Sequence, residues 1–455
     1  MSGTVGIDVG SGGVRAVMLD DHLQVLGREE RALPPGSRSA GGGHRLDESV
    51  LVETARAVLD GLCSRLGERP EAVAVCGTAG TLCLHDGAGG IAADAVAYDD
   101  HRHGTGLDRV RAWHRQVPRA HRVLAVADAV LEALGAEPGA TDWTNALRLG
   151  WDPVTQSWPA GADGLRRAGL LPEAVPPGTP AGRITVPGAA RGARLVRGTT
   201  DGCALELAAG GLEQGGAGSP PDDPRWTISL GTTITWRTVV TGDAPGLRLP
   251  PGAYLHRLRS DVWLVSAAGN SGGGVLRALE PGADLTALDD RSRVPTGLAA
   301  YPLARPGERF PVAGPRFPGF GLPAADDPRL HAAILEGTAL VTRLGVDRLC
   351  AGGAAPPRRL RVSGGGARSR LWMRLLASAL GRPVTAVPDA EPALGMALLA
   401  AATVSGAAPG ALGAAGGAEG ETRHLPDPEL ADALEEAYAA LVAGVLRWER
   451  RPVPR

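Results

Sequence analysis

The chain has 455 residues, 44% of them hydrophobic, which is enough to build the cores of two or three domains. Its 47 basic residues, all of them arginine, nearly balance its 49 acidic residues and leave a formal net charge of −2, so the chain lacks the basic excess of a nucleic-acid-binding protein. Because the sequence contains no lysine, a Schiff-base lysine and the P-loop motif with its phosphate-binding lysine are both excluded.

The beginning of the chain predicts an α/β unit that opens with a β-meander. Apolar and β-branched runs predict strands, and apolar residues at helical spacing predict one helix. The strands are expected over residues 5–9, 14–19, 22–33 and 72–76, and the helix over residues 46–66. This order of elements is typical of a sheet covered by helices.

The second half of the chain repeats the opening pattern after a Gly/Pro-rich linker at residues 213–225. A strand over residues 226–230, a Gly-Thr-Thr turn and a returning strand over residues 234–240 match the first hairpin. We therefore predict an internal duplication, with domains 1–222 and 223–455. Further expected elements are helices over residues 270–279, 331–348, from 368 and 428–448, a strand over 360–363 and a loop over 404–420.

Both hairpin turns combine small residues with hydroxyl side chains and free backbone N–H groups. Such turns let the backbone approach an anion closely. Either turn alone is also compatible with an ordinary glycine hairpin, since 66 residues are Gly, but one turn in each half favours a grip on a polyphosphate. Asp8, just before the first turn, could hold Mg²⁺ beside phosphates or simply cap the turn. The candidate phosphate contacts are Ser11, Gly12, Gly13, Arg15, Gly231, Thr232 and Thr233.

Two Gly-Gly-Gly runs open predicted helices, at residues 272–274 and 364–366. A glycine-rich turn at a helix N-terminus can bind phosphate or let a flat ring lie against the backbone. A third run, at residues 41–43, has no such context and is expected in a loop. The candidate nucleotide contacts are Gly272, Gly273, Gly365 and Gly366.

A second group of polar residues points to a polyhydroxylated ligand. Asp201 stands at a predicted turn into a helix over residues 204–209, where it could act as a base or as a helix N-cap. Thr78 follows a strand, and Asp100 and Arg102 could accept from and donate to sugar hydroxyls, or form a solvated charge run.

The five cysteines are scattered and form no C-x-x-C pair, which argues against a disulfide framework or a cysteine-rich zinc site and favours a reducing compartment. Residues 1–10 lack the basic start of a secretory signal. The Ala/Leu-rich run at residues 393–402 is too short to span a membrane. We therefore expect a cytoplasmic protein without membrane or nucleic-acid partners.

Taken in chain order, the motifs described above and their flanking segments resemble the FGGY family of carbohydrate kinases over essentially the whole chain. GIDVGSGGVRAV and SLGTT look like the family's two phosphate motifs, and GTTDGCALELAAG like the segment that carries the catalytic aspartate. GGGARSRLWMRLLASALGRPV with EPALGMALLAAA resembles the adenosine region, and TDWTNALRLGWDP and LPEAVPPGTPAGRI resemble signatures of the first domain. Within the family, CGTAGT, YDDHR and YPLARPGERFPV look like the D-ribulose kinase branch.

The resemblance implies an α/β fold of two duplicated actin/hexokinase-like (ribonuclease H-like) domains with a central interdomain cleft. It implies transfer of the ATP γ-phosphoryl group to a pentulose such as D-ribulose, with Asp201 as general base. Asp8 would position Mg²⁺, and the sugar would lie near Asp8, Thr78, Asp100, Arg102 and Asp201. Homodimers are common in the family.

Three other functions stay open at this point. One is a kinase for D-xylulose, L-ribulose or gluconate. Another is a non-catalytic sugar or nucleotide sensor on the same fold. The third is an actin-like or chaperone ATPase with a protein partner.

Overall fold

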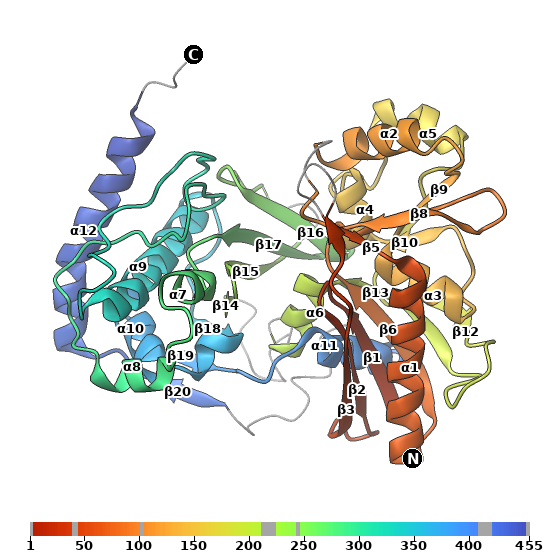
Figure 1. Cartoon of the computed structure of the whole chain (residues 1–455), viewed down its shortest axis with the longest axis horizontal. Coiled ribbons are helices and arrows are strands. Elements are labelled where there is room, and N and C mark those ends of the chain that lie inside the picture. The colour runs from red at the N-terminus through yellow and green to blue at the C-terminus, as the bar shows by residue number, and fades with distance from the viewer. Residues whose placement is uncertain are drawn as a thin grey trace. The chain divides into compact units, whose positions relative to one another are not determined.

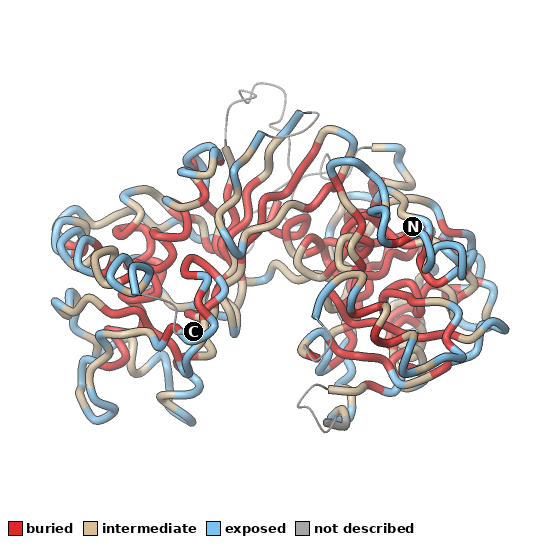
Figure 2. The backbone as a smooth tube through the Cα atoms, turned by 90° about the horizontal axis from the view of Figure 1, so that it is seen from above, coloured by how far each residue is buried: buried red, intermediate tan, exposed pale blue. Residues whose placement is uncertain are grey.

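The computed structural model describes residues 3–38, 44–100, 104–210, 224–242, 246–407 and 421–451 (Figure 1). The chain forms two compact units. The first comprises Met1–Gly216, His256–Val262 and Ala390–Gly417, and the second comprises Ala217–Leu255, Trp263–Asp389 and Ala418–Arg455. These units are not the two continuous segments 1–222 and 223–455, because a segment near the C-terminus packs with the first unit. Within each unit, Figure 2 shows buried stretches of the chain on the inside and exposed stretches on the outside.

The first unit is built on a six-stranded sheet of order β12-β13-β6-β1-β2-β3. Its strands are β1 Gly3–Val9, β2 Gly13–Leu19, β3 Val25–Ala32, β6 Pro70–Gly77, β12 Pro180–Arg183 and β13 Arg194–Thr200. β1, β6 and β13 run parallel, whereas β2 and β3 return antiparallel. β3 begins later than the expected residue 22, because the Asp20 carboxylate accepts hydrogen bonds from the N–H groups of His22 and Gln24 and holds a turn there.

Helices cover both faces of this sheet. α1 Glu48–Leu66 and α3 Val126–Leu134 pack on the face that carries Val5, Ile7 and Val9. α11 Pro392–Ser405 packs on the other face, where Thr4 Oγ1 donates to the Ala397 carbonyl at 3.1 Å. Side chains alternate between the faces of a strand, so Asp8 lies on the same face as α11.

The rest of the first unit adds a five-stranded sheet and short helices. That sheet has the order β4-β5-β8-β7-β9. Its strands are β4 Ser37–Arg38, β5 His44–Leu46, β7 Leu82–His85, β8 Ile91–Val96 and β9 Arg122–Ala125. The other elements are α2 Gly106–Gln116, α4 Trp143–Leu149, the 3₁₀-helix η1 Ala160–Ala162, α5 Asp163–Arg167, α6 Asp201–Ala208, and the paired strands β10 Ala140–Asp142 and β11 Glu173–Val175.

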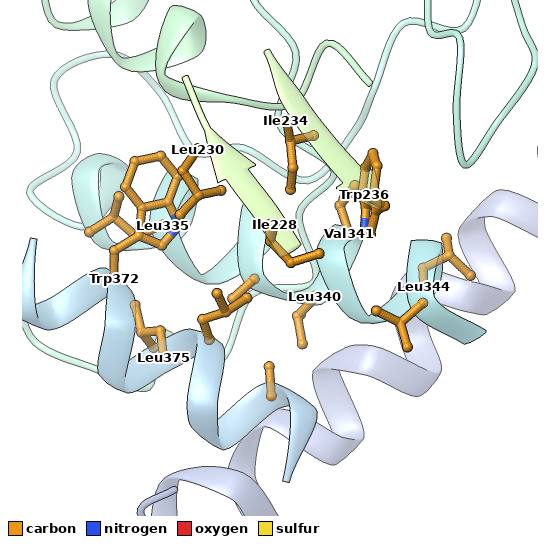
Figure 3. Packing of buried hydrophobic residues seen from close by; sticks show 14 of the residues in the cluster. Ile228, Leu230, Ile234, Trp236, Leu335, Leu340, Val341, Leu344, Trp372 and Leu375 are labelled. Atoms are coloured by element: carbon orange, nitrogen blue, oxygen red, sulfur yellow. The ribbon is translucent and has the colours of Figure 1, made fainter. Parts of the chain in front are cut away.

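The second unit carries most of a seven-stranded sheet of order β16-β17-β15-β14-β18-β19-β20, of which residues 256–262 belong to the first unit. Its strands are β14 Arg225–Leu230, β15 Ile234–Thr241, β16 Ala253–Arg259, β17 Val262–Gly269, β18 Arg359–Ser363, β19 Val384–Ala386 and β20 Thr422–His424. Its helices are α7 Gly273–Leu279, α8 Leu285–Arg291, α9 Leu330–Ala351, the 3₁₀-helix η2 Gly365–Arg368, α10 Arg370–Leu380 and α12 Pro428–Glu449. Figure 3 shows apolar side chains of β14 and β15, among them Trp236, packed against side chains of α9 and α10, among them Trp372.

The two main sheets repeat one topology, as the sequence predicted. In each, a hairpin (β1-β2 and β14-β15) pairs antiparallel, and its first strand pairs parallel with a later strand (β6 and β18). A further parallel strand and an antiparallel edge strand follow in both sheets (β13-β12 and β19-β20). The expected linker at residues 213–225 and the expected loops at residues 41–43 and 404–420 lie largely outside the described residues.

Candidate active site

In the first unit, three parallel strands bring polar residues to one edge of the sheet. Asp8 of β1 is in register with Cys76 of β6, and Gly77 is in register with Thr200 of β13. Asp201 follows Thr200 directly as the first residue of α6. Ligands of open α/β sheets bind at the carboxyl ends of the strands, so this edge is a candidate site.

Asp8 is a buried carboxylate, only 5% exposed, in an electrostatically strained position. Burial, and after it the charge of Asp201, raise its pKa to about 7 against the opposing effects of Arg15 and Cys76. The Arg15 guanidinium lies 3.7 Å from the carboxylate, and the Cys76 thiol donates to it at 3.7 Å. A cation bound here would relieve this strain, which fits the expected role of Asp8 toward Mg²⁺.

The donor set also limits which metal the site could take. Among the residues that the structure describes, no three His, Cys, Asp or Glu side chains come together as a metal-binding group. Mg²⁺ is usually held by one or two carboxylates together with water and substrate phosphates. Asp8, as a single carboxylate beside phosphates, fits that pattern.

Asp201 is half-buried and is held from two sides through one carboxylate oxygen. Oδ1 accepts hydrogen bonds from the Ala79 N–H at 3.3 Å and from the Gly202 N–H at 2.8 Å. The cap position of α6 belongs to Thr200, in an extended conformation. The carboxylate thus joins the start of α6 to the turn after β6, which is the turn expected to bind sugar.

The first hairpin turn is narrow, and its tip is open. The Gly10 N–H donates to the Gly13 carbonyl at 3.0 Å. Ser11 and Gly12 are exposed, and a Cβ on Gly12 would meet nothing within 4 Å. Arg15 lies beside this turn and pairs with Glu30 at 2.8 Å as well as with Asp8.

The residues expected to contact sugar lie on two turns that one arginine fastens together. Thr78 is half-buried and its N–H donates to the Val9 carbonyl at 3.1 Å. The buried Arg109 donates to the Gly80 carbonyl at 2.8 Å and to the Ala97 carbonyl at 2.7 Å. Asp100 is also buried, and its charge acts on Arg109.

Asp100 has a second cationic neighbour. Arg45 lies 4.0 Å from its carboxylate and stacks over the Trp113 ring. Asp100 therefore lies in the field of two cations, Arg45 and Arg109. Arg102 lies outside the described residues.

In the second unit, the turn at Gly231–Thr233 packs directly on the start of α7. The Gly273 N–H donates to the Gly231 carbonyl at 2.8 Å, and the Gly274 N–H donates to the Thr232 carbonyl at 2.9 Å. A Cβ on Gly272 would lie 2.6 Å from the Thr233 carbonyl carbon. The predicted phosphate turn at residues 231–233 and the predicted nucleotide turn at residues 272–274 therefore pack directly against each other.

The turn at Gly364–Gly366 packs on the end of β14. Gly364 has φ +83°, in the left-handed region that favours glycine. A Cβ on Gly366 would lie 2.7 Å from Leu230 Cβ, whereas one on Gly365 would meet nothing within 4 Å. Three glycine-rich turns of this unit therefore follow the ends of β14, β17 and β18, with Gly365 exposed.

Residues 253–404 match the C-terminal domain of the FGGY family of carbohydrate kinases. The protein is a carbohydrate kinase, an enzyme that transfers a phosphoryl group to a sugar hydroxyl.

Solved structures share the fold of this protein over nearly its whole length. A xylulose kinase from Brucella ovis is 20% identical, with a TM-score of 0.84 and coverage of 98% of this chain and 99% of that one. A gluconate kinase from Lactobacillus acidophilus is 15% identical (TM-score 0.83, 97% of each chain). A Plasmodium falciparum glycerol kinase with ADP is 14% identical (TM-score 0.79, 98% of each chain). The expected actin/hexokinase-like fold is confirmed. No helix in the described part of the chain has the length and apolar character needed to cross a bilayer.

Sequence reasoning missed two residues that shape this candidate site. Arg109, which joins the two turns expected to contact sugar, stands in an amphipathic helix without any motif. Glu391, whose charge raises the pKa of Asp8 among smaller contributions, comes from the far end of the sequence. The sequence does contain one signal for Glu391. Proline favours the first helical turn, so Pro392 indicates that a helix begins directly after Glu391.

Proposed function

We propose that this kinase uses ATP and Mg²⁺ to phosphorylate a pentulose hydroxyl, most simply that of D-ribulose, with Asp201 as general base. The oxygen of the hydroxyl would bond to the γ-phosphorus as the bond from phosphorus to the β–γ bridging oxygen breaks. ADP would leave, and the hydroxyl proton would pass to Asp201. Phosphoryl transfer of this kind depends mainly on alignment and charge stabilisation.

The position of the Asp201 carboxylate carries the proposal. Two backbone N–H groups hold its Oδ1 at the carboxyl edge of the sheet, and one of them belongs to the turn after β6. A base must be held within hydrogen-bond reach of the proton it accepts. A sugar bound against that turn would present its hydroxyl beside a carboxylate that is already oriented.

The glycine turns support the assignment of the nucleotide. Exposed backbone at Ser11 and Gly12 in the first unit, and at Thr232 in the second, would contact phosphates. Gly272, Gly273, Gly365 and Gly366 would line the nucleotide site. Mg²⁺, held by Asp8, would neutralise the charge of the phosphates when bound. The chain has no lysine that could supply this positive charge.

The choice of sugar rests on the subfamily motifs. CGTAGT, YDDHR and YPLARPGERFPV resemble the D-ribulose kinase branch. D-xylulose, L-ribulose and gluconate are the alternative acceptors, and the solved structures named above include a xylulose kinase and a gluconate kinase. A homodimer is the assembly we propose by analogy with the family.

The test is ADP release from Mg·ATP across D-ribulose, D-xylulose, L-ribulose and D-gluconate. The amide of Asp201→Asn can still accept from both N–H groups, so this variant should fold and bind Mg·ATP while kcat falls about 10²- to 10⁴-fold. Asp47→Asn is the matched control, because Asp47 also accepts backbone hydrogen bonds at a helix start in the same unit. A kcat for Asp201→Asn within tenfold of wild type would exclude Asp201 as the base.

A further inference from the structure

A buried histidine in the second unit lies between two carboxylates. His331, at the start of α9, is only 2% exposed. Its Nδ1 lies 2.7 Å from a Glu280 carboxylate oxygen, and its Nε2 lies 2.8 Å from an Asp289 carboxylate oxygen. The three residues come from three segments, since Glu280 follows α7 and Asp289 belongs to α8.

The geometry fixes how many protons this group holds. An ionised carboxylate can only accept hydrogen bonds, and a neutral imidazole has one donor. Two carboxylate contacts therefore require both ring nitrogens to donate, which makes His331 an imidazolium. Burial opposes its charge, but hydrogen bonds with Asp289 and Glu280 outweigh burial and raise the pKa of His331. Glu280 and Asp289 are also the charged groups whose fields act on it.

Asp289 carries the effect of His331 to the glycine turn after β18. Its second carboxylate oxygen accepts from the Ser369 hydroxyl at 2.6 Å. Ser369 caps α10 and accepts from the Trp372 N–H at 2.9 Å. The Trp372 ring in turn packs under Gly366, where an added Cβ would lie 2.9 Å from the ring. Figure 3 shows Trp372 beside Leu230, at the end of β14.

We propose that His331 is a positioning residue of the nucleotide site, which holds Asp289 so that Ser369 and Trp372 fix the turn at Gly364–Gly366. This inference rests on the proposed function, which gives that turn to the nucleotide. His331 itself would not touch ATP. Its removal would leave two carboxylates, 11% and 15% exposed, facing each other without a cation between them.

Two readouts test the proposal on the full chain. The first is hydrogen exchange of the amides of residues 364–369, and the second is Mg·ATP affinity by calorimetry, with the Michaelis constants for ATP and sugar. His331→Ala and Asp289→Ala should speed exchange in the turn. They should raise the Kd for Mg·ATP about 2- to 10-fold, the effect of losing one hydrogen-bonded link, with the sugar KM unchanged.

Two further variants separate positioning from general destabilisation. Glu336→Gln alters another buried carboxylate of α9, which accepts from the Thr296 N–H at 2.8 Å and has no tie to the glycine turn. It should lower thermal stability without changing either readout. Ser369→Thr keeps the hydroxyl and should restore what Ser369→Ala loses.

Each outcome decides between the two proposals. Unchanged exchange in the turn of a folded His331→Ala or Asp289→Ala variant would overturn the positioning role. An equal rise in Kd with Glu336→Gln would do the same. Faster exchange in a protein whose wild type binds no Mg·ATP would support the link between His331 and the turn, and would overturn the proposed function instead.

Discussion

Gly365 and Gly366 are neighbours in one turn, yet an added methyl group would meet different surroundings at each. At Gly366 the new Cβ would lie 2.7 Å from Leu230 Cβ and 2.9 Å from the Trp372 ring. At Gly365 it would meet nothing within 4 Å, and the backbone there is not left-handed. Replacing each glycine by alanine therefore separates the packing of the turn from its contact with a ligand.

The two substitutions should affect the free energy of unfolding differently. Overpacking at Gly366→Ala should cost about 1–3 kcal/mol, which lowers the Tm by roughly 2–4 °C for each kcal/mol in a unit of this size. Gly365→Ala should be neutral or stabilising by up to about 1 kcal/mol, because alanine restricts the unfolded chain. If the nucleotide lies on Gly365, the methyl group takes space from it and should weaken Mg·ATP binding about tenfold or more.

Thermal unfolding and calorimetric titration of Mg·ATP measure the two effects separately. The decisive result is a Gly365→Ala protein that is as stable as wild type and binds Mg·ATP poorly. If it binds Mg·ATP like the wild type, Gly365 does not contact the nucleotide. If instead it unfolds as early as Gly366→Ala, the space above Gly365 is not open.

Three other expectations follow from the described contacts. His331→Ala should destabilise the protein most below about pH 6.5, and the difference should shrink as pH rises through the raised pKa of the native imidazolium; a constant difference in unfolding free energy would contradict this. Asp8→Asn should abolish most activity yet stabilise the fold, since the native pKa of about 7 lies above the ordinary 3.8. That gain should be full above pH 7 and absent below pH 3.8, as urea unfolding across pH would show. Gly6→Ala should cost about 3 kcal/mol or more, because its Cβ would collide with the Ala393 carbonyl; a near-wild-type Tm would refute that packing.

The sequence-based prediction was right for elements whose contacts join residues close together in the sequence. The two hairpins form as expected at β1-β2 and β14-β15, because glycine turns join β-branched runs there. The approach of Asp8 to Asp201 was also predictable in kind, since both follow or end buried strands of one parallel set. Element boundaries shifted where a side chain bonds the backbone, as Asp20 does before β3.

Long-range packing could not be predicted in the same way. No pattern in the sequence tells that α11 covers β1, because the pairing is decided by shape, with Gly6 leaving room for the helix backbone at Ala393. The surroundings of Asp100 were missed for a related reason. Arg45 and Arg109 reach it from separate elements, and single motifs do not reveal charges that gather only in the folded chain.

The placement of α11 has a consequence for how the protein is made. β1 leaves the ribosome long before α11, because the helix that covers one of its faces is separated from it by most of the chain. At about 5–20 residues per second, roughly 20–80 s pass before α11 is synthesised. During that time Val17 and Leu19, which cluster with Ala393 and Leu394 in the finished protein, lack the part of their cover that α11 supplies. The core on this face of the first sheet is therefore completed only when translation has reached the last part of the chain.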